Sequence, residues 1–167
     1  RDSTASYTLT VHLKDLPPLV FEDQVSSPGG VGFPIAMNLM DATDILMRNP
    51  YEKVEVQKVE LAVSITDRLS RGTIEWIRLE ETTVEEGDPI HLQVAVQNLL
   101  GELEIHPLQI DLPDGSGSGP IQITVSDAGN YLLESMKRNP DHFRTRNLED
   151  LLKLIQEYKR SDEVYVS

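Results

Sequence analysis

The stretch "DLPDGSGSGPIQITV", residues 111–125, holds the residues that most resemble a presented nucleophile. In it, Ser116 and Ser118 alternate with three glycines just before Pro120. Several hydrolases hold a nucleophilic serine in a glycine-rich turn. Such a serine needs a base within hydrogen-bond reach and donors for the oxyanion, and His91 and His106 are the candidate bases. The alternative is a pliable, exposed loop between two strands, because glycines at alternate positions hold a serine poorly.

Metal chemistry has few candidate ligands. The chain has no cysteine, which excludes disulfides and thiolate ligands. Its four histidines are His12, His91, His106 and His142, and no two of them have the spacing of a helical metal pair. The carboxylates that crowd the acidic turn 80–88 are Glu80, Glu81, Glu85, Glu86 and Asp88. They could bind calcium weakly, but the EF-hand spacing is absent and a solvated charge run is the preferred interpretation. We therefore predict no catalytic, cofactor-binding or metal-binding residue.

The charge of the chain excludes several classes of partner. The formal net charge is −13, and residues 1–127 hold 8 Lys and Arg against 21 Asp and Glu. An acidic body repels phosphate backbones and anionic lipids, so we expect neither nucleic acid nor a membrane surface as partner. No apolar run is long enough for a membrane span. The acidity indicates solubility or, alternatively, a docking face for a basic partner.

The first fifty residues predict a strand followed by a helix. In "SYTLTVHL" every second residue from Tyr7 to Leu13 is apolar, as in a half-buried strand. Leu19 to Phe21 is a candidate second strand. From Pro34 an apolar stripe follows at helical spacing, formed by Ile35, Leu39, Ala42 and Leu46. Met37, Met40 and Met47 widen this stripe, and we interpret them as core-filling residues, with a greasy binding surface as the alternative.

Residues 53–126 change to a period of two. About five strands follow one another, with turns every 8–14 residues. Phase slips between Val56 and Val59, and between Trp76 and Ile77, indicate β-bulges or bends. The last of these strands covers Ile121, Ile123 and Val125. This spacing favours an immunoglobulin-like antiparallel β-sandwich over 53–126.

The last forty residues predict helices and a final short strand. Asp127 can cap the first helix, and Asn147 can cap a second one whose stripe runs through Leu148, Leu152 and Ile155. "EVYVS" is a candidate final strand. We therefore expect a mainly β fold with α elements, composed of a strand–helix segment 1–52, the sandwich 53–126 and a helical tail 127–167, all packed as one compact unit.

The order of these segments resembles a known family. The segments "RNPYEKVEVQKVELAVSITD", "VEEGDPIHLQVAVQ", "IDLPDG", "PIQITVSDAG" and "NLEDLLKLIQEYKRSDEVYVS" follow one another as in the region downstream of the peptidase domain in large exported bacterial proteins of the SpoIVB-type serine peptidase family. That family places its nucleophile in a Gly-Met-Ser-Gly-Ser-Pro setting. When the two runs are aligned on Pro120, the nucleophile's position is Gly117, and no histidine of this chain follows a glycine as the family's histidine does. The resemblance thus implies the non-catalytic region.

The expected function follows from this resemblance and from the missing catalytic set. It is a non-enzymatic accessory module of an exported bacterial protein, in the periplasm or cell envelope, that positions or regulates a linked serine peptidase domain or contacts another envelope protein. The start "RDSTAS", without an initiator Met, suggests a piece of a longer chain. The alternatives are an adhesin-like or ligand-binding β-sandwich, a serine hydrolase, and self-association through an edge strand such as "SYTLTVHL".

Overall fold

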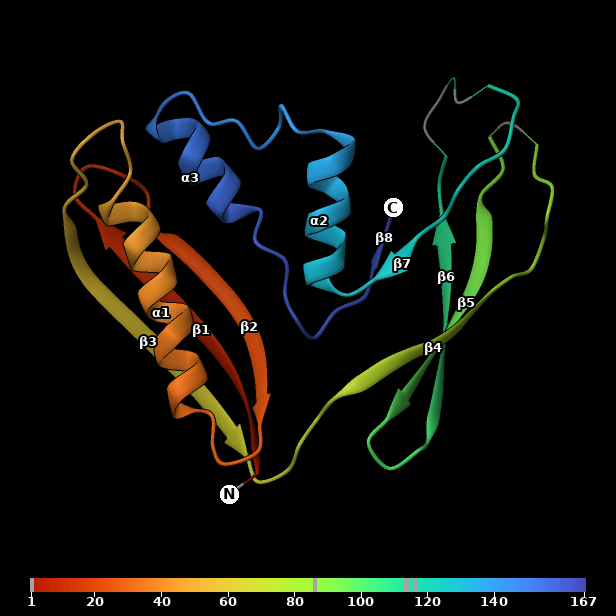
Figure 1. The fold of residues 1–167 in the computed structure, drawn as a ribbon, viewed down its shortest axis with the longest axis horizontal. Helices are drawn as coiled ribbons and strands as arrows, with labels where there is room; N and C mark the ends of the chain where they lie inside the picture. Colours follow the sequence, from red (N-terminus) through yellow and green to blue (C-terminus); the bar gives the residue numbers. More distant parts are fainter. Residues whose placement is uncertain (1, 86, 113–114, 116) are drawn as a thin grey trace. The chain divides into compact units, whose positions relative to one another are not determined.

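The chain folds into two compact units. A computed structural model describes residues 2–85, 87–112, 115 and 117–167 (Figure 1). Unit 1 consists of Arg1–Leu69 and Ser126–Tyr165, and unit 2 consists of Ser70–Val125 and Val166–Ser167. The main part of unit 2, Ser70–Val125, is thus inserted between the two segments of unit 1. Among the described residues, none of the helices has both the length and the apolar character that a bilayer span requires.

Unit 1 is built on a three-stranded antiparallel sheet of order β2-β1-β3. Its strands are β1 (Ser3–Leu13), β2 (Leu19–Ser27) and β3 (Val56–Thr66). The predicted alternation in β1 is confirmed, because its odd-numbered residues from Ala5 to Leu13 are buried and lie on one face. The register shifts between His12 and Leu13, which leaves Gln57 as the extra residue of a bulge at the predicted phase slip in β3.

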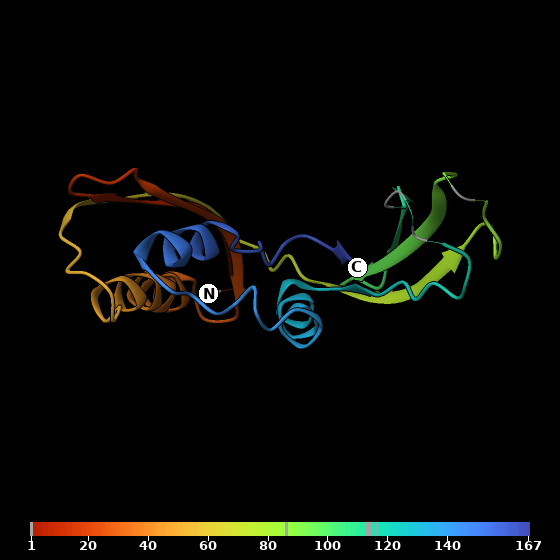
Figure 2. The ribbon, with the colours of Figure 1, turned by 90° about the horizontal axis from the view of Figure 1, so that it is seen from above.

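Three helices belong to unit 1: α1 (Gly32–Met47), α2 (Ala128–Arg138) and α3 (Leu148–Gln156). Figure 2 shows α1 and α3 on the same side of the sheet. There Ile35, Leu46, Leu148 and Leu152 pack with the buried residues of β1 in one core. Both predicted N-caps are confirmed: the backbone N–H of Asn130 donates to Asp127 over 2.8 Å, and that of Asp150 donates to Asn147 over 2.8 Å.

Unit 2 contains a three-stranded antiparallel sheet of order β4-β5-β6. Its strands are β4 (Gly72–Leu79), β5 (Ile90–Asn98) and β6 (Leu103–Ile110). The central strand β5 buries Ile90, Leu92 and Val94 on one face. The register shift in β4 lies between Ile74 and Trp76, one residue before the predicted slip. A further pair of short strands, β7 (Val125–Ser126) and β8 (Tyr165–Val166), includes the predicted final strand.

The strand partners differ from those expected of a sandwich over 53–126. Antiparallel sheets with a few helices are confirmed, but β3, the first strand of that range, pairs with β1. Residues 53–69 therefore belong to unit 1 with the segments expected to flank the sandwich. The strand expected over 121–125 is reduced to β7, whose first residue is Val125. Alternation tells which side chains share a face, but it does not tell which strand lies alongside.

The methionines of α1 are the clearest correction. The prediction that Met37, Met40 and Met47 fill the core is wrong, because they are 40%, 61% and 60% exposed. The buried side of α1 is already occupied by Ile35 and Leu46, with Leu39 and Ala42 packed beside them. The remaining apolar residues of the helix therefore lie on its other side, in solvent.

Candidate functional site

The serine loop borders a cavity in unit 2. This cavity has a volume of about 580 Å³ and lies between the segments 81–87 and 117–121, at the end of the sheet where β5 begins. Ser118 is exposed and lines it, whereas Ser116 lies outside the described residues. The wall is mainly apolar, and its large side chains are Leu79, Val84, Ile90, Leu112, Ile121 and Ile123.

Neither candidate base reaches Ser118. Among the described residues, no histidine lines this cavity. His91 follows Ile90 on β5 and so points to the opposite face of the sheet. His106 pairs with Val94, four residues along β5 from Ile90, which corresponds to about 13 Å of strand. The structure therefore does not bring together the serine and the histidines that a hydrolase would need.

Two further histidines contact carboxylates at the surface. The Nε2 atom of His12 lies 2.5 Å from Glu60, and that of His142 lies 2.6 Å from Glu157. Lys58 and then His12 lower the pKa of Glu60 by hydrogen bonding to its carboxylate. Within the described parts of the chain, no three His, Cys, Asp or Glu side chains are placed to hold a metal ion. Glu86 of the acidic turn lies outside those residues, so the alternative of weak calcium binding at this turn is not tested.

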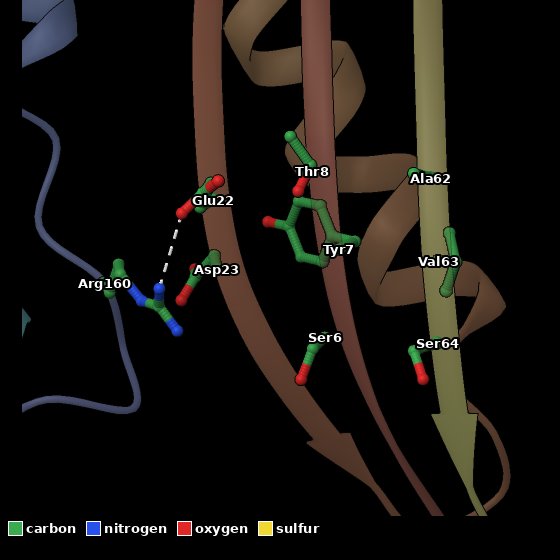
Figure 3. A pocket seen from close by; sticks show the side chains of 9 residues that line it. All are labelled: Ser6, Tyr7, Thr8, Glu22, Asp23, Ala62, Val63, Ser64 and Arg160. Carbon is green, nitrogen blue, oxygen red and sulfur yellow. Dashed lines mark ion pairs between the residues drawn. The ribbon is translucent and has the colours of Figure 1, made fainter.

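A shallow depression of about 360 Å³ lies on the sheet of unit 1 (Figure 3). Ser6, Thr8 and Ser64 supply hydroxyl groups to it from the polar face of β1 and β3. At its rim, Arg160 lies 3.5 Å from Glu22 and makes two hydrogen bonds with Asp162, of 2.9 and 2.8 Å. These hydrogen bonds raise the pKa of Arg160 and lower that of Asp162. Because carboxylates already surround the guanidinium, the depression has no cation available for an anionic ligand.

Beside the depression, Asp23 holds the C-terminal segment against β2. Asp23 is only 3% exposed. The hydroxyl of Tyr158 donates to it over 2.8 Å, and Ser161 donates its backbone N–H over 2.6 Å and its hydroxyl over 2.7 Å. Burial of the Tyr158 hydroxyl, followed by its hydrogen bond to Asp23, raises the pKa of this tyrosine. No local sequence pattern predicts this clamp, because its partners lie 135 or more residues apart in the chain.

The turn between β5 and β6 presents two leucines to solvent. Leu99 is 57% exposed and Leu100 is 85% exposed. The Asn98 side chain accepts the backbone N–H groups of Leu100 and Glu102 over 2.9 and 3.0 Å. Asn98 also donates to the Glu102 carboxylate over 2.8 Å. Gly101 completes the turn at φ +83°, a conformation that favours glycine. Two exposed leucines thus stand on a turn fixed by several hydrogen bonds.

Unit 1 has exposed apolar groups on α1 and β3. Phe33, Met37, Met40 and Met47 follow one another at spacings that place them on one side of α1, and we call them the outer stripe. Phe33 is 77% exposed. The β3 row, formed by Val59, Leu61, Val63 and Ile65, pairs with the buried residues of β1, yet its members are 40–59% exposed. Both sets lack a covering element among the described residues.

Comparison with known proteins adds no relative. No protein-family model, no curated protein and no solved structure matches this chain.

Proposed function

We propose that the chain is a non-enzymatic protein-interaction module of a larger exported bacterial protein, and that it docks on a linked serine peptidase domain and positions or regulates it. The observation that carries this proposal is that α1 is apolar on two opposite sides. One side packs into the core of unit 1 through Ile35 and Leu46. The other side is the outer stripe, which faces solvent.

A helix needs one apolar side to pack on its own core, so a second apolar side in solvent is a surface that a partner can cover. Large contiguous apolar patches are rare on the surface of monomeric proteins, and where they occur they commonly mark interaction sites. Methionine suits such a surface, because its unbranched, polarisable side chain adapts to the shape of a partner. The sequence resemblance supplies the identity of the partner and the location in the periplasm or cell envelope. An immunoglobulin-like closure of the β-rich region is compatible with this role but is not needed for it.

The test is binding between this chain and the separately expressed peptidase domain that the resemblance places upstream of it. Met40→Glu adds a charge to the outer stripe, and we expect it to weaken binding at least tenfold, about 1.4 kcal/mol. Met136→Glu is the matched control, since Met136 is also exposed but lies on α2. Peptidase activity and limited proteolysis are measured with and without the chain. The proposal fails if the two proteins neither bind nor change each other's activity or cleavage pattern.

A second candidate function is ligand binding in the cavity of unit 2. Its volume of about 580 Å³ and the large apolar side chains in its wall suit a small, mainly apolar molecule, although Glu81 and Glu85 also line it. Ile123→Trp would fill part of this space. A set of apolar fluorescent probes should then bind the unchanged protein and not the variant, and equal binding to both would exclude the cavity as the site.

A further inference from the structure

We infer that the β5–β6 turn is a docking element that inserts Leu99 and Leu100 into an apolar pocket with a basic rim on a partner protein. This role rests on the proposed function and deepens it, because it names a second contact surface and the chemistry that the surface recognises. The docking tip is defined here as Leu99 and Leu100, and Leu103 and Ile105 continue its apolar surface along one face of β6.

The rigidity of the turn is the first argument. A solvated leucine on a flexible loop would lose conformational freedom on binding, and that loss would reduce its affinity. Here the Asn98 side chain and the backbone bond from Gly101 to the Asn98 carbonyl, at 3.0 Å, already fix the loop. The Gln97 amide donates to the Gly101 carbonyl over 3.1 Å and adds a further bond. Two apolar side chains on a preformed turn have the character of an interface anchor.

The position of the tip separates it from the cavity. Figure 1 shows the β5–β6 turn at the opposite end of the unit 2 sheet from the loops that surround that cavity. The tip and the cavity can therefore be altered independently by mutation.

Charge complementarity identifies the partner's rim. Unit 2 holds 2 Arg against 10 Asp and Glu, and no Lys or Arg occurs between Leu79 and Met136. Glu102 and Glu104 closely follow the tip in the sequence, and both are exposed. A surface that receives Leu100 must accept these carboxylates at its edge, so it requires Lys or Arg side chains around an apolar centre.

The same charges argue against two other partners for the docking tip, a membrane surface and a second copy of the chain. A bacterial membrane surface is anionic and repels unit 2, since like charges meet at the headgroups. A second copy of the chain would bring two acidic units together, which is again unfavourable. A basic protein surface is the occupant that gains from both the leucines and the carboxylates.

The experiment measures binding of the whole chain to the upstream peptidase domain at low and at moderate salt. Leu99→Gln with Leu100→Gln should weaken binding at least tenfold, mainly through faster dissociation, because an anchor is lost. Leu132→Gln with Leu133→Gln is the matched control, since these adjacent leucines are also exposed but lie on α2. Glu104→Lys should slow association several-fold, and added salt should weaken binding to the unchanged chain. Unfolding midpoints verify that each variant is folded.

The outcomes separate the docking tip from the proposed function. If the unchanged chain binds and both leucine double variants bind equally well, the docking tip is wrong while the proposed function stands. If the unchanged chain does not bind the peptidase domain at all, both are wrong. Co-sedimentation with phosphatidylcholine vesicles, with and without phosphatidylglycerol, is the third arm. Vesicle binding that the tip variant loses would replace the protein pocket with a membrane and overturn the inference, and sedimentation that shows tip-dependent dimers would overturn it likewise.

Discussion

Asp23 shows how one buried carboxylate can fasten a distant segment of the chain. It accepts hydrogen bonds from Tyr158 and Ser161 and from the backbone N–H of Gln24, the last over 2.8 Å. Hydrogen bonds to a charged group stabilise more than neutral ones, and a buried acceptor without donors is costly. Asp23 and its donors therefore fix the segment around Tyr158–Ser161 on the edge strand β2.

Removing this carboxylate should destabilise the protein more than removing one of its donors. For Asp23→Ala we expect a loss of about 3 kcal/mol in the free energy of unfolding, because several donors lose their acceptor. Tyr158→Phe should cost about 1 kcal/mol, since it removes one hydrogen bond while Asp23 keeps its donors from Ser161 and Gln24. Urea unfolding measures both values. Tyr131→Phe, which removes a hydroxyl from another partly exposed ring, should change little, and an equal loss in all three variants would contradict the clamp.

The tyrosines of unit 1 also predict a loss of stability at alkaline pH. Burial raises the pKa of Tyr7 and of Tyr158, and burial together with the Glu163 carboxylate raises the pKa of Tyr165 to about 12. The folded protein therefore keeps protons that the unfolded chain releases near the ordinary value of 10.0. This contribution is complete below pH 10 and is lost as the pH rises toward the folded-state values. Unfolding measured from pH 9 to 12 should show a declining stability, with a smaller decline in Tyr158→Phe.

At the scale of the elements, the β5–β6 turn should depend on its asparagine and its glycine. Gly101→Ala places a Cβ at φ +83°, and we expect a loss of about 1 kcal/mol. Asn98→Ala removes the side-chain bonds to Leu100 and Glu102 and should cost about 1–2 kcal/mol. Denaturant unfolding measures the losses. Gly119→Ala serves as control, because its Cβ would meet nothing within 4 Å at an ordinary φ. A similar loss in this variant would contradict a special role of Gly101 in the turn.

The sequence predicts elements well where one chain segment determines them. The alternation in β1, the caps Asp127 and Asn147 and the bulge before Val59 depend on neighbouring residues, and all of them appear in the structure. The pairing of β3 with β1 depends on contacts about 50 residues apart, and periodicity contains no information on them.

The candidate surfaces illustrate the same limit. The helical stripe at Met37 and Met40 was visible, but which side of α1 faces the core is decided by the sheet beneath it. The exposure of Leu99 and Leu100 follows from the turn that Asn98 fixes. The "NLLGE" motif indicates a turn but not which of its side chains face solvent. The hydroxyl–carboxylate clamp at Asp23 had no local signal at all.

At the scale of the whole molecule, the insertion of unit 2 into unit 1 gives the chain two separate cores. The core of unit 1 is formed by Leu9, Val11, Leu46 and Leu152 with their neighbours. That of unit 2 is centred on Leu92 and Val94 of β5. The chain passes between the units at three points, after Leu69, Val125 and Tyr165. Because each unit has its own buried residues, each can lose its structure separately.

We therefore expect two transitions in scanning calorimetry, and unit 2 should melt first. Unit 2 has fewer than sixty residues, and a smaller unit buries a smaller fraction of its surface than a larger one such as unit 1. Leu92 is 1% exposed. Leu92→Ala should therefore lower the midpoint temperature of the first transition alone, through a loss of about 2–5 kcal/mol in the unfolding free energy of unit 2. Asp23→Ala should lower only the second. A single transition that both variants shift by the same amount would instead mean that the two units unfold as one cooperative body, and the docking surfaces of each would then have to be tested together.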